Sequence, residues 1–310
     1  MKNILLMILV CVSLTVSATG KWKTLRLDEE SSPKNDVVAL SFDKSGALWA
    51  GTSFGVYRQV ATDWQLQGTE NIYVQSLYID RNDTKWVGLW AGGLWRCCTG
   101  GSWEKLEKAT STGCINTING DQQGNIWIGD WGGGLTQIAS ESENLTTYKA
   151  DKVALGDNSV NAVAQDTKGK MWFGTYHGVS SLDQGKWTLY NKSNSRLPNE
   201  DVYALTAAPD GGLWIGTCNG LACLKEGKWS VFTTANSALP CNLILSLAVD
   251  KQGCLWVGTP NGVARFDGKK WTVYNQQNSP LPNDRIQCIT IKGSAVYLGT
   301  SKGIAVFTEQ

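Results

Sequence analysis

A short motif built on an aromatic residue followed by glycine recurs seven times along the chain. Its form is clearest at Leu213-Trp-Ile-Gly-Thr217. Successive copies are 37, 41, 45, 42, 42 and 41 residues apart. The central aromatics are Trp49, Trp86, Trp127, Trp172, Trp214, Trp256 and Tyr297. A fixed period of about forty residues indicates a repeat architecture, in which each copy is one structural unit.

Each repeat divides into four predicted strands. The first alternates apolar and polar residues, as in 37–42, and ends in a turn such as Asp43-Lys-Ser-Gly46, where Asp caps the turn and Gly accepts a positive φ. The aromatic motif is the second strand, 262–266 exemplifies the third, and Trp271-Thr-Val-Tyr274 the fourth. Four antiparallel strands in about forty residues describe one blade of a β-propeller. The sequence therefore predicts an all-β fold, a seven-bladed β-propeller.

Two further patterns support a closed ring. Nine or ten residues before each central aromatic lies a small residue, as expected where the first strands of all blades converge on a narrow axis: Ala39, Ser76, Thr117, Ala162, Ala204, Ser246 and Cys288. The last repeat has only three strands, and the segment Trp22–Leu25 has the pattern of the missing fourth. We expect this segment to join the last blade, which removes an exposed sheet edge.

The N-terminus predicts export. Met1-Lys-Asn is followed by an apolar run over 4–16 and by the small residues Val16-Ser-Ala18, the pattern of a cleaved secretory signal. The run is shorter than the roughly 20 apolar residues that a membrane span needs. We expect a signal peptide over 1–18, a single propeller over 19–310, and a periplasmic or secreted location.

Charge and cysteine content exclude some functions. The formal net charge is +1, which gives no electrostatic footprint for nucleic acid. Because there is one histidine and no pair of Cys-x-x-Cys motifs, the sequence predicts no metal and no cofactor. Eight cysteines remain after the signal; we expect most of them to be small core residues, with one or two disulfides among them.

The Leu-Trp-x-Gly-Thr motif, with Asp-x-x-Gly before it and Trp-x-x-Tyr and Asn-Ser-x-Leu-Pro-Asn after it, resembles the two-component regulator propeller repeat over essentially all of 21–310. The resemblance implies a periplasmic sensor of glycan breakdown products, as in hybrid two-component systems of Bacteroidetes-type bacteria. Sensors of that family usually continue into an immunoglobulin-like domain, a membrane helix and a kinase. This chain stops within its seventh blade, so the resemblance implies a binding module and not a kinase.

Candidate ligand-binding residues are those that the repeat does not require. The turns between second and third strands, which should share one face with the connections between blades, carry Phe54, Trp90, Asp130, Trp131, Tyr176 and His177. The entrances of the first strands add Tyr73, Asp201 and Arg285. Aromatic rings offer flat apolar area with a polar tip, which suits a sugar. The alternative is that Trp90 and Trp131 only pack on neighbouring loops.

These observations favour an exported, non-enzymatic propeller that binds a carbohydrate or another small molecule. Its protein partner would be a separate membrane sensor or another exported protein. One alternative is a polysaccharide lyase or glycoside hydrolase with its site at the same channel mouth, although no nucleophile motif or committed carboxylate pair accompanies His177. Another is a protein-interaction scaffold, which would show a broad apolar patch.

Overall fold

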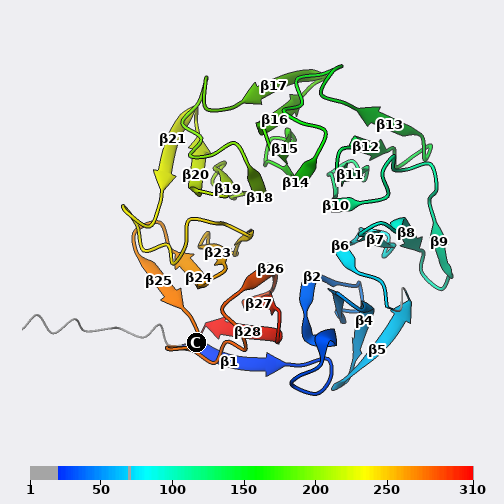
Figure 1. Ribbon diagram of the computed structural model, residues 1–310, viewed down its shortest axis with the longest axis vertical. Helices are drawn as coiled ribbons and strands as arrows, with labels where there is room; N and C mark the ends of the chain where they lie inside the picture. Colours follow the sequence, from blue (N-terminus) through cyan, green and yellow to red (C-terminus); the bar gives the residue numbers. More distant parts are fainter. Residues whose placement is uncertain (1–19, 69–70, 310) are drawn as a thin grey trace, which may run out of the picture.

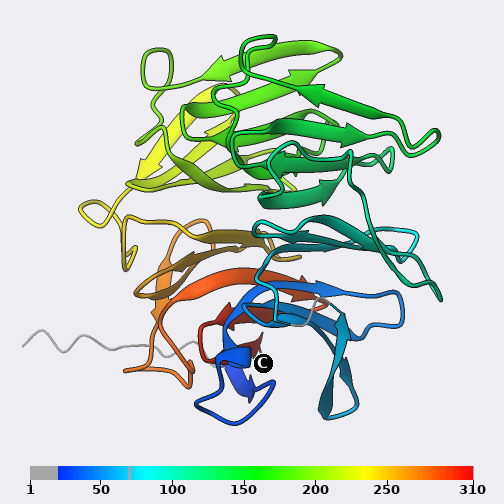
Figure 2. The same cartoon turned by 45° about the vertical axis from the view of Figure 1, so that its right-hand side comes forward.

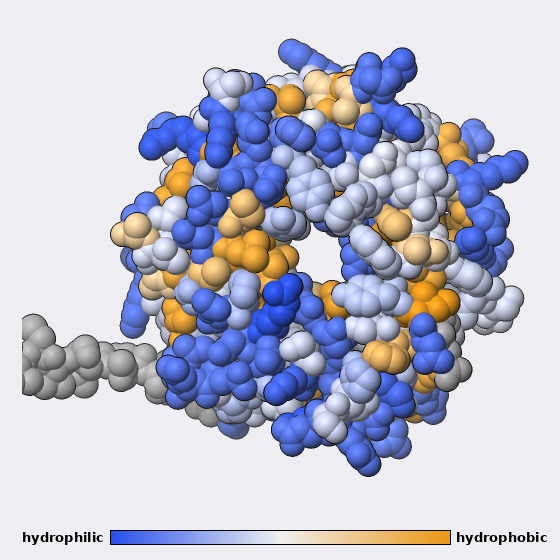
Figure 3. Space-filling model, in the orientation of Figure 1, coloured by the Kyte–Doolittle hydropathy of each residue, from blue (hydrophilic) through white to orange (hydrophobic). Residues whose placement is uncertain are grey.

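Seven four-stranded antiparallel sheets form a closed ring in the computed structural model, which describes residues 20–68 and 71–309 (Figure 1). The sheets pack face to face around the ring (Figure 2), and its axis is open (Figure 3). The predicted all-β, seven-bladed propeller is confirmed. The proposed signal peptide over 1–18 lies outside the described residues. No helix in the described part of the chain is long and apolar enough to cross a membrane.

The strands of each blade run outward from the axis. The innermost are β2 (Val37–Phe42), β6 (Val74–Ile79), β10 (Ile115–Gly120), β14 (Val160–Gln165), β18 (Val202–Ala207), β22 (Ser246–Val249) and β26 (Ile286–Lys292). The second are β3 (Leu48–Thr52), β7 (Lys85–Leu89), β11 (Ile126–Asp130), β15 (Met171–Thr175), β19 (Leu213–Thr217), β23 (Leu255–Thr259) and β27 (Ala295–Thr300). The third are β4 (Gly55–Val60), β8 (Gly93–Cys97), β12 (Gly134–Ile138), β16 (Gly178–Asp183), β20 (Gly220–Lys225), β24 (Gly262–Phe266) and β28 (Gly303–Glu309).

The outermost strands are β5 (Asp63–Gly68), β9 (Trp103–Lys105), β13 (Leu145–Tyr148), β17 (Lys186–Tyr190), β21 (Lys228–Phe232), β25 (Trp271–Tyr274) and, in the last blade, β1 (Gly20–Leu25). A 3-10 turn, η1 (Pro33–Asn35), follows β1. Strand β1 pairs with β28 from Gly20 opposite Glu309 to Leu25 opposite Ile304. The predicted closure by the N-terminal strand is confirmed, and the strand begins two residues earlier than expected.

The glycine of the aromatic motif is where each blade meets the next. A Cβ added at Gly51 would lie 2.6 Å from Val74 Cγ1, and one at Gly216 would lie 2.5 Å from Ile244 Cγ2. The space left by the missing side chain of each glycine is filled by a residue of the next blade. That residue is β-branched and fully buried in every case: Val37, Val74, Ile115, Val160, Val202, Ile244 and Ile286. Because any side chain on the glycine would overlap this residue, the motif requires glycine.

The small residues of the inner strands lie directly opposite these glycines, as in Ala39 opposite Gly51 and Ala204 opposite Gly216. Small residue and glycine together make the shallow surface that the next blade covers. The expectation of small residues where the blades converge is confirmed, and their direct neighbour is the adjoining blade.

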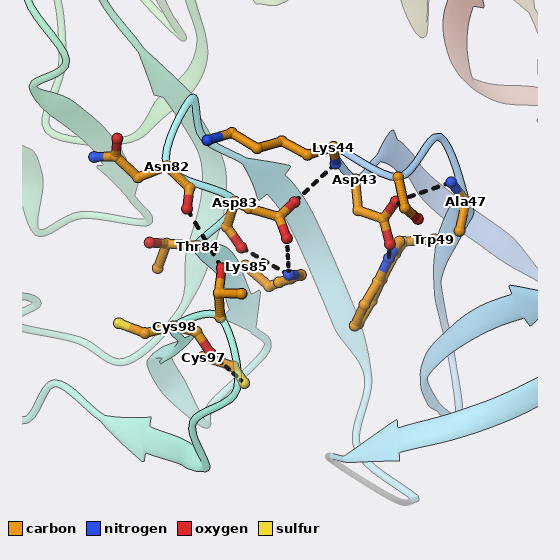
Figure 4. A network of polar contacts seen from close by, with 12 residues as sticks. Asp43, Lys44, Ala47, Trp49, Asn82, Asp83, Thr84, Lys85, Cys97 and Cys98 are labelled. Atoms are coloured by element: carbon orange, nitrogen blue, oxygen red, sulfur yellow. Dashed lines mark hydrogen bonds and ion pairs between the residues drawn. The ribbon is translucent and has the colours of Figure 1, made fainter.

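An aspartate anchors the central tryptophan in five blades. Asp43 Oδ2 accepts from Trp49 Nε1 at 2.9 Å, while its Oδ1 accepts from Ala47 N in the turn (Figure 4). The same bond, at 2.8–3.0 Å, joins Asp80, Asp121, Asp166 and Asp250 to the tryptophan six residues later. One carboxylate therefore closes the hairpin turn and pairs a buried indole N–H.

The cysteines differ from expectation. All eight are free thiols; Cys254 is buried, Cys98 is exposed and the other six are half-buried. The expectation of one or two disulfides, and of mostly core positions, is wrong. Cys97 and Cys98 are neighbours at the end of β8, and Cys218 and Cys223 both belong to blade five, yet none of these four thiols forms a disulfide.

Replacing Gly216 with alanine should destabilise the ring, because the new methyl group overlaps Ile244. We expect a loss of about 1–3 kcal/mol in the free energy of unfolding, as for other overpacked cores. Urea titration of the purified protein measures it. Gly212→Ala in the same blade is the control, since its Cβ would come no closer than 3.2 Å to a flexible carboxylate. Equal effects of the two substitutions would contradict the role of the glycine.

The stability of the first blade should fall in acid. Burial alone would raise the pKa of Asp43, but hydrogen bonds from Ser45, Trp49 and Arg58 outweigh it and hold the pKa well below its ordinary value of 3.8. The ionised carboxylate therefore stabilises the fold fully above the unfolded pKa, and this contribution is lost as the pH falls towards the folded pKa.

Asp43→Asn should accordingly lower the free energy of unfolding at about pH 6 and change it less at about pH 3, measured by urea titration. Asp63→Asn, at an exposed carboxylate in β5, is the matched control and should change neither. A deficit in Asp43→Asn that is the same at both pH values would show that ionisation of this carboxylate is not the cause.

Candidate functional site

The turns between second and third strands and the connections between blades lie on one face of the ring, here called the upper face. Trp90 N donates to Tyr73 O at 3.1 Å, Trp131 N to Cys114 O at 2.9 Å, and Cys218 N to Asp201 O at 3.0 Å. Each bond joins a second–third turn to the residue just before the inner strand of its own blade. The predicted candidates in both sets therefore share the upper face.

Four aromatic rings make a continuous series along this face, here called the aromatic ladder. Trp90 and Trp131 have ring centroids 5.2 Å apart, Trp131 and Tyr176 6.1 Å, and Tyr176 and Tyr203 6.0 Å, all edge to face. The ladder spans the turns after β7, β11 and β15 and ends on β18. Edge-to-face packing is the favoured geometry of aromatic pairs and fixes the rings relative to one another.

The two tryptophans of the ladder remain open to solvent. Trp90 is 44% exposed and Trp131 46% exposed, and they are the only tryptophans among the large exposed hydrophobic residues of the described chain. Tyr73, itself 39% exposed, lies beside Trp90. Tyr73, Gln75 and Trp90 line a shallow hollow of about 340 Å³. The two indoles thus pack on a neighbouring loop and also leave nearly half their surface free.

Trp90 and Trp131 lie in turns between second and third strands whose sequence differs from that of the other blades. In blades one, four, five, six and seven, a threonine hydroxyl closes a two-residue turn, as Thr175 Oγ1 does by donating to Gly178 O at 3.0 Å. Blades two and three have Leu89 and Asp130 at that position, and their turns are one residue longer. Without the threonine, the turn extends and presents its first residue, Trp90 or Trp131, to solvent.

Asp130 acts within the protein. It is 3% exposed, and its Oδ2 accepts from the backbone N–H groups of Ser111 and Thr112 at 3.0 and 3.2 Å. The Thr112 hydroxyl donates to the other oxygen. The carboxylate therefore ties the connection between blades two and three to the start of the Trp131 turn, and can affect a ligand only by positioning that turn.

The remaining candidates surround the ladder. His177 is exposed, with Nδ1 3.4 Å from Asp157 Oδ2. Asp201 accepts from the Cys218 thiol at 3.6 Å. Arg285 is exposed and lies just before β26 of blade seven. Phe54 is half-buried in the first blade, outside the ladder. The structure thus brings Trp90, Trp131 and Tyr176 into direct contact.

The tyrosines of the mouth are held in the neutral form. Burial raises the pKa of Tyr176, and the charges of Asp201 and Asp157 raise it further. Burial likewise raises the pKa of Tyr203 and of Tyr73, where Asp36 adds to the effect and Arg285 opposes it. At neutral pH these phenols are hydrogen-bond donors and acceptors, which suits a ligand rich in hydroxyl groups.

Tyr203 and the residues at equivalent positions in other blades were not predicted from the sequence. The inner strands of six blades show a register shift just after their β-branched first residue, as between Val202 and Ala204. Such bulges re-aim a side chain. The bulged residues include Gln75, Asn116, Asn161, Tyr203 and Gln287. The sequence does mark these positions: in these repeats a polar or aromatic residue directly follows the buried Val or Ile that begins the inner strand.

Some of these bulged side chains link the blades around the mouth. Asn116 Nδ2 donates to Asn161 Oδ1 at 3.0 Å, and Asn161 Nδ2 donates to Val202 O at 3.1 Å. Gln287 Nε2 donates to Asp36 Oδ1 at 2.7 Å. Polar side chains therefore line part of the mouth, and Figure 3 shows blue and pale residues around much of the opening, with a hydrophobic patch, drawn orange, along its left edge.

Residues 154–177, 196–219 and 238–261 match the model of the two component regulator propeller family. The chain carries two-component regulator propeller repeats. The matched segments each run from a connection between blades to the following second–third turn. No protein with curated annotation matches the chain in sequence.

Solved structures share the fold over most of this chain. The extracellular domain of a hybrid two component system from B. thetaiotaomicron is 23% identical with a TM-score of 0.82, over 93% of this chain and 41% of that one. The chain thus spans less than half the length of that relative. Virginiamycin B lyase from Staphylococcus aureus is 14% identical with a TM-score of 0.76, over 93% and 99% of the two chains. At these identities the likeness concerns the fold.

Proposed function

We propose that the chain is an exported, non-enzymatic ligand-binding propeller of the sensor type, and that its upper face binds a carbohydrate. The observation that carries this proposal is the pair Trp90 and Trp131, held edge to face at 5.2 Å yet nearly half exposed. The propeller core does not need either indole, since the central tryptophans are separate residues. Exposed, fixed aromatic rings beside a channel mouth are typical of a binding surface.

The chemistry around the rings suits a neutral sugar. An indole face covers the apolar C–H face of a pyranose, and the phenols of Tyr73, Tyr176 and Tyr203 offer hydrogen bonds to its hydroxyl groups. The rings of the ladder already pack on one another without a ligand, so little side-chain entropy should be lost when a ligand lies on them. His177 and Asp157 at one end, with Asp201, add polar contacts at the mouth.

Export and signalling are part of the same proposal. The basic and apolar start over 1–18 supports a cleaved signal peptide. The likeness to extracellular domains of two-component systems supports a periplasmic or secreted sensor module. In this role the propeller would act with a separate membrane sensor or another exported protein, and ligand binding at the upper face would be the signal.

The test is thermal stabilisation of the mature protein by a panel of neutral oligosaccharides, followed by calorimetric titration of any glycan that raises the melting temperature. Trp90→Ala and Trp131→Ala should each weaken binding by at least about tenfold, the loss typical of a tryptophan at the centre of a binding surface. Leu145→Ala, which removes a 41%-exposed side chain from outer strand β13, is the control and should bind as the parent does.

Three outcomes would contradict the proposal. Unchanged affinity in both tryptophan variants would show that the ladder is only packing. Release of shortened or unsaturated products from the glycan would indicate an enzyme. If no oligosaccharide raises the melting temperature and a protein binds saturably on the upper face, the propeller would be a protein-interaction scaffold.

A further inference from the structure

The opposite face of the ring, here called the lower face, carries the turns between first and second strands and between third and outer strands. In three blades an arginine of the third strand stacks over the central tryptophan of its own blade. The guanidinium carbon lies 5.9 Å from the ring centroid in one pair and 5.8 Å in two: Arg58 on Trp49, Arg96 on Trp86 and Arg265 on Trp256. In each case the arginine is the register partner of the tryptophan.

Two of these arginines also join their blade to the next one. Arg96 Nη1 lies 2.8 Å from Glu143 Oε1, in the turn before the outer strand of blade three. Arg265 Nη2 lies 3.1 Å from Glu309 Oε1 in blade seven. We call the boundary between two neighbouring blades a seam. At two seams the guanidinium thus lies between an indole face of its own blade and a carboxylate of the next blade.

The seam between blades four and five keeps only half of that arrangement. The register partner of Trp172 is Ser181, so no arginine extends from β16. Glu226 lies in the turn before the outer strand of blade five, at a positive φ of 51°, as Glu143 does in blade three at 54°. Glu226 is exposed and has no hydrogen bond or ion pair with any described residue.

A cavity of about 380 Å³ opens at this seam. Its aromatic walls are Trp172, Tyr190 and Trp229, with Tyr190 5.7 Å from Trp172 and 6.1 Å from Trp229. Its charged lining consists of Asp166, Asp183, Glu226, Lys168 and Lys170. Three carboxylates against two ammonium groups leave one excess negative charge. The cavity thus combines aromatic surface with an unpaired carboxylate.

Lys170 does not take the place of the missing arginine. Its ammonium lies 5.3 Å from the Trp172 ring and is paired with Asp183 at 3.4 Å within its own blade. Trp49 shows that one ring accommodates two cations, because Lys85 Nζ lies 5.4 Å from it in addition to Arg58. Lys85 enters from the next blade and is neutralised by Asp83 (Figure 4).

We propose that the cavity between blades four and five binds the guanidinium group of an arginine side chain from a partner polypeptide. The guanidinium would lie near the aromatic wall formed by Trp172, Tyr190 and Trp229 and pair with Glu226, which reproduces between two molecules the contact that Arg96 and Glu143 make within one. The arginine would supply the positive charge that this seam lacks. The site is on the lower face and is independent of the carbohydrate proposal.

The probe is the blocked tripeptide acetyl-Gly-Arg-Gly-amide, titrated by calorimetry into the full chain. Its citrulline analogue has the same shape without the charge and should not bind, and agmatine distinguishes a free guanidine from a peptide arginine. Glu226→Gln should weaken binding by about threefold to fivefold, as expected for one partly exposed ion pair. Glu141→Gln, at another exposed glutamate of a lower-face turn, should leave binding unchanged.

Lys170→Gln gives a change of opposite sign. It removes a repelling ammonium and frees Asp183, so binding of the arginine peptide should tighten, and added salt should weaken binding in every variant that binds. A purely structural role of these residues would not produce opposite shifts. Ser181→Arg supplies an internal guanidinium and should compete with the peptide while raising the melting temperature.

Equal binding of the arginine and citrulline peptides, no saturable binding of the arginine peptide, or an unchanged affinity in Glu226→Gln would each overturn the proposal. Binding of agmatine but not of the peptide would overturn the polypeptide as the source and leave a small guanidine as the ligand.

Discussion

The contact on which the ring depends is a β-branched side chain entering the gap over a glycine of the preceding blade. It occurs at all seven seams, including the one between Gly299 and Val37 that closes the circle. Glycine lets the sheets approach closely, and Val or Ile fills the space with few rotamers to lose. The apolar clusters accordingly lie between blades: one of them joins Trp49 and Val56 of the first blade to Val74 and Val87 of the second. Stability is therefore shared around the ring.

A ring held together at its inner strands leaves its turns free to differ. The threonine that closes most second–third turns is replaced by Leu89 and Asp130 in two adjacent blades, and each of those turns gains one residue and an exposed tryptophan. On the lower face, the arginine that covers the central tryptophan in three blades is replaced by Ser181, and a cavity opens there. In both places a departure from the repeat, and not the repeat itself, creates the surface that we propose binds a ligand.

The sequence predicts the fold in considerable detail because the restraint is periodic. The spacing of the central aromatics, the small residues opposite the glycines and the missing fourth strand at the C-terminus led to the blade count and to closure by β1. The interaction between Asp43 and Trp49 was only partly predicted: the turn was expected, but the bond to the indole depends on how the carboxylate is oriented. The cysteines were misjudged because the burial of each thiol, and which thiols lie close enough to bond, depend on three-dimensional packing.

The site was less predictable. Trp90, Trp131 and Tyr176 stood out because the repeat does not require them, yet their mutual contacts depend on the curvature of the ring. Asp130 was read as a surface residue, although its neighbours Ser111 and Thr112 bury it. Tyr203 was missed because a bulge, which leaves little mark on a single strand, turns it towards the mouth. The repeat period is enough to predict the propeller scaffold. Residues that depart from the repeat indicate a possible binding surface, but their arrangement depends on neighbours that the sequence does not reveal.

The most direct test of the account is a crystal structure of the mature protein soaked with an oligosaccharide that raises its melting temperature. The account predicts a sugar ring resting on Trp90 or Trp131 at the upper mouth, within hydrogen-bonding reach of Tyr73 or Tyr176. A sugar bound on the lower face or on the outer strands, with the aromatic ladder bare, would contradict it.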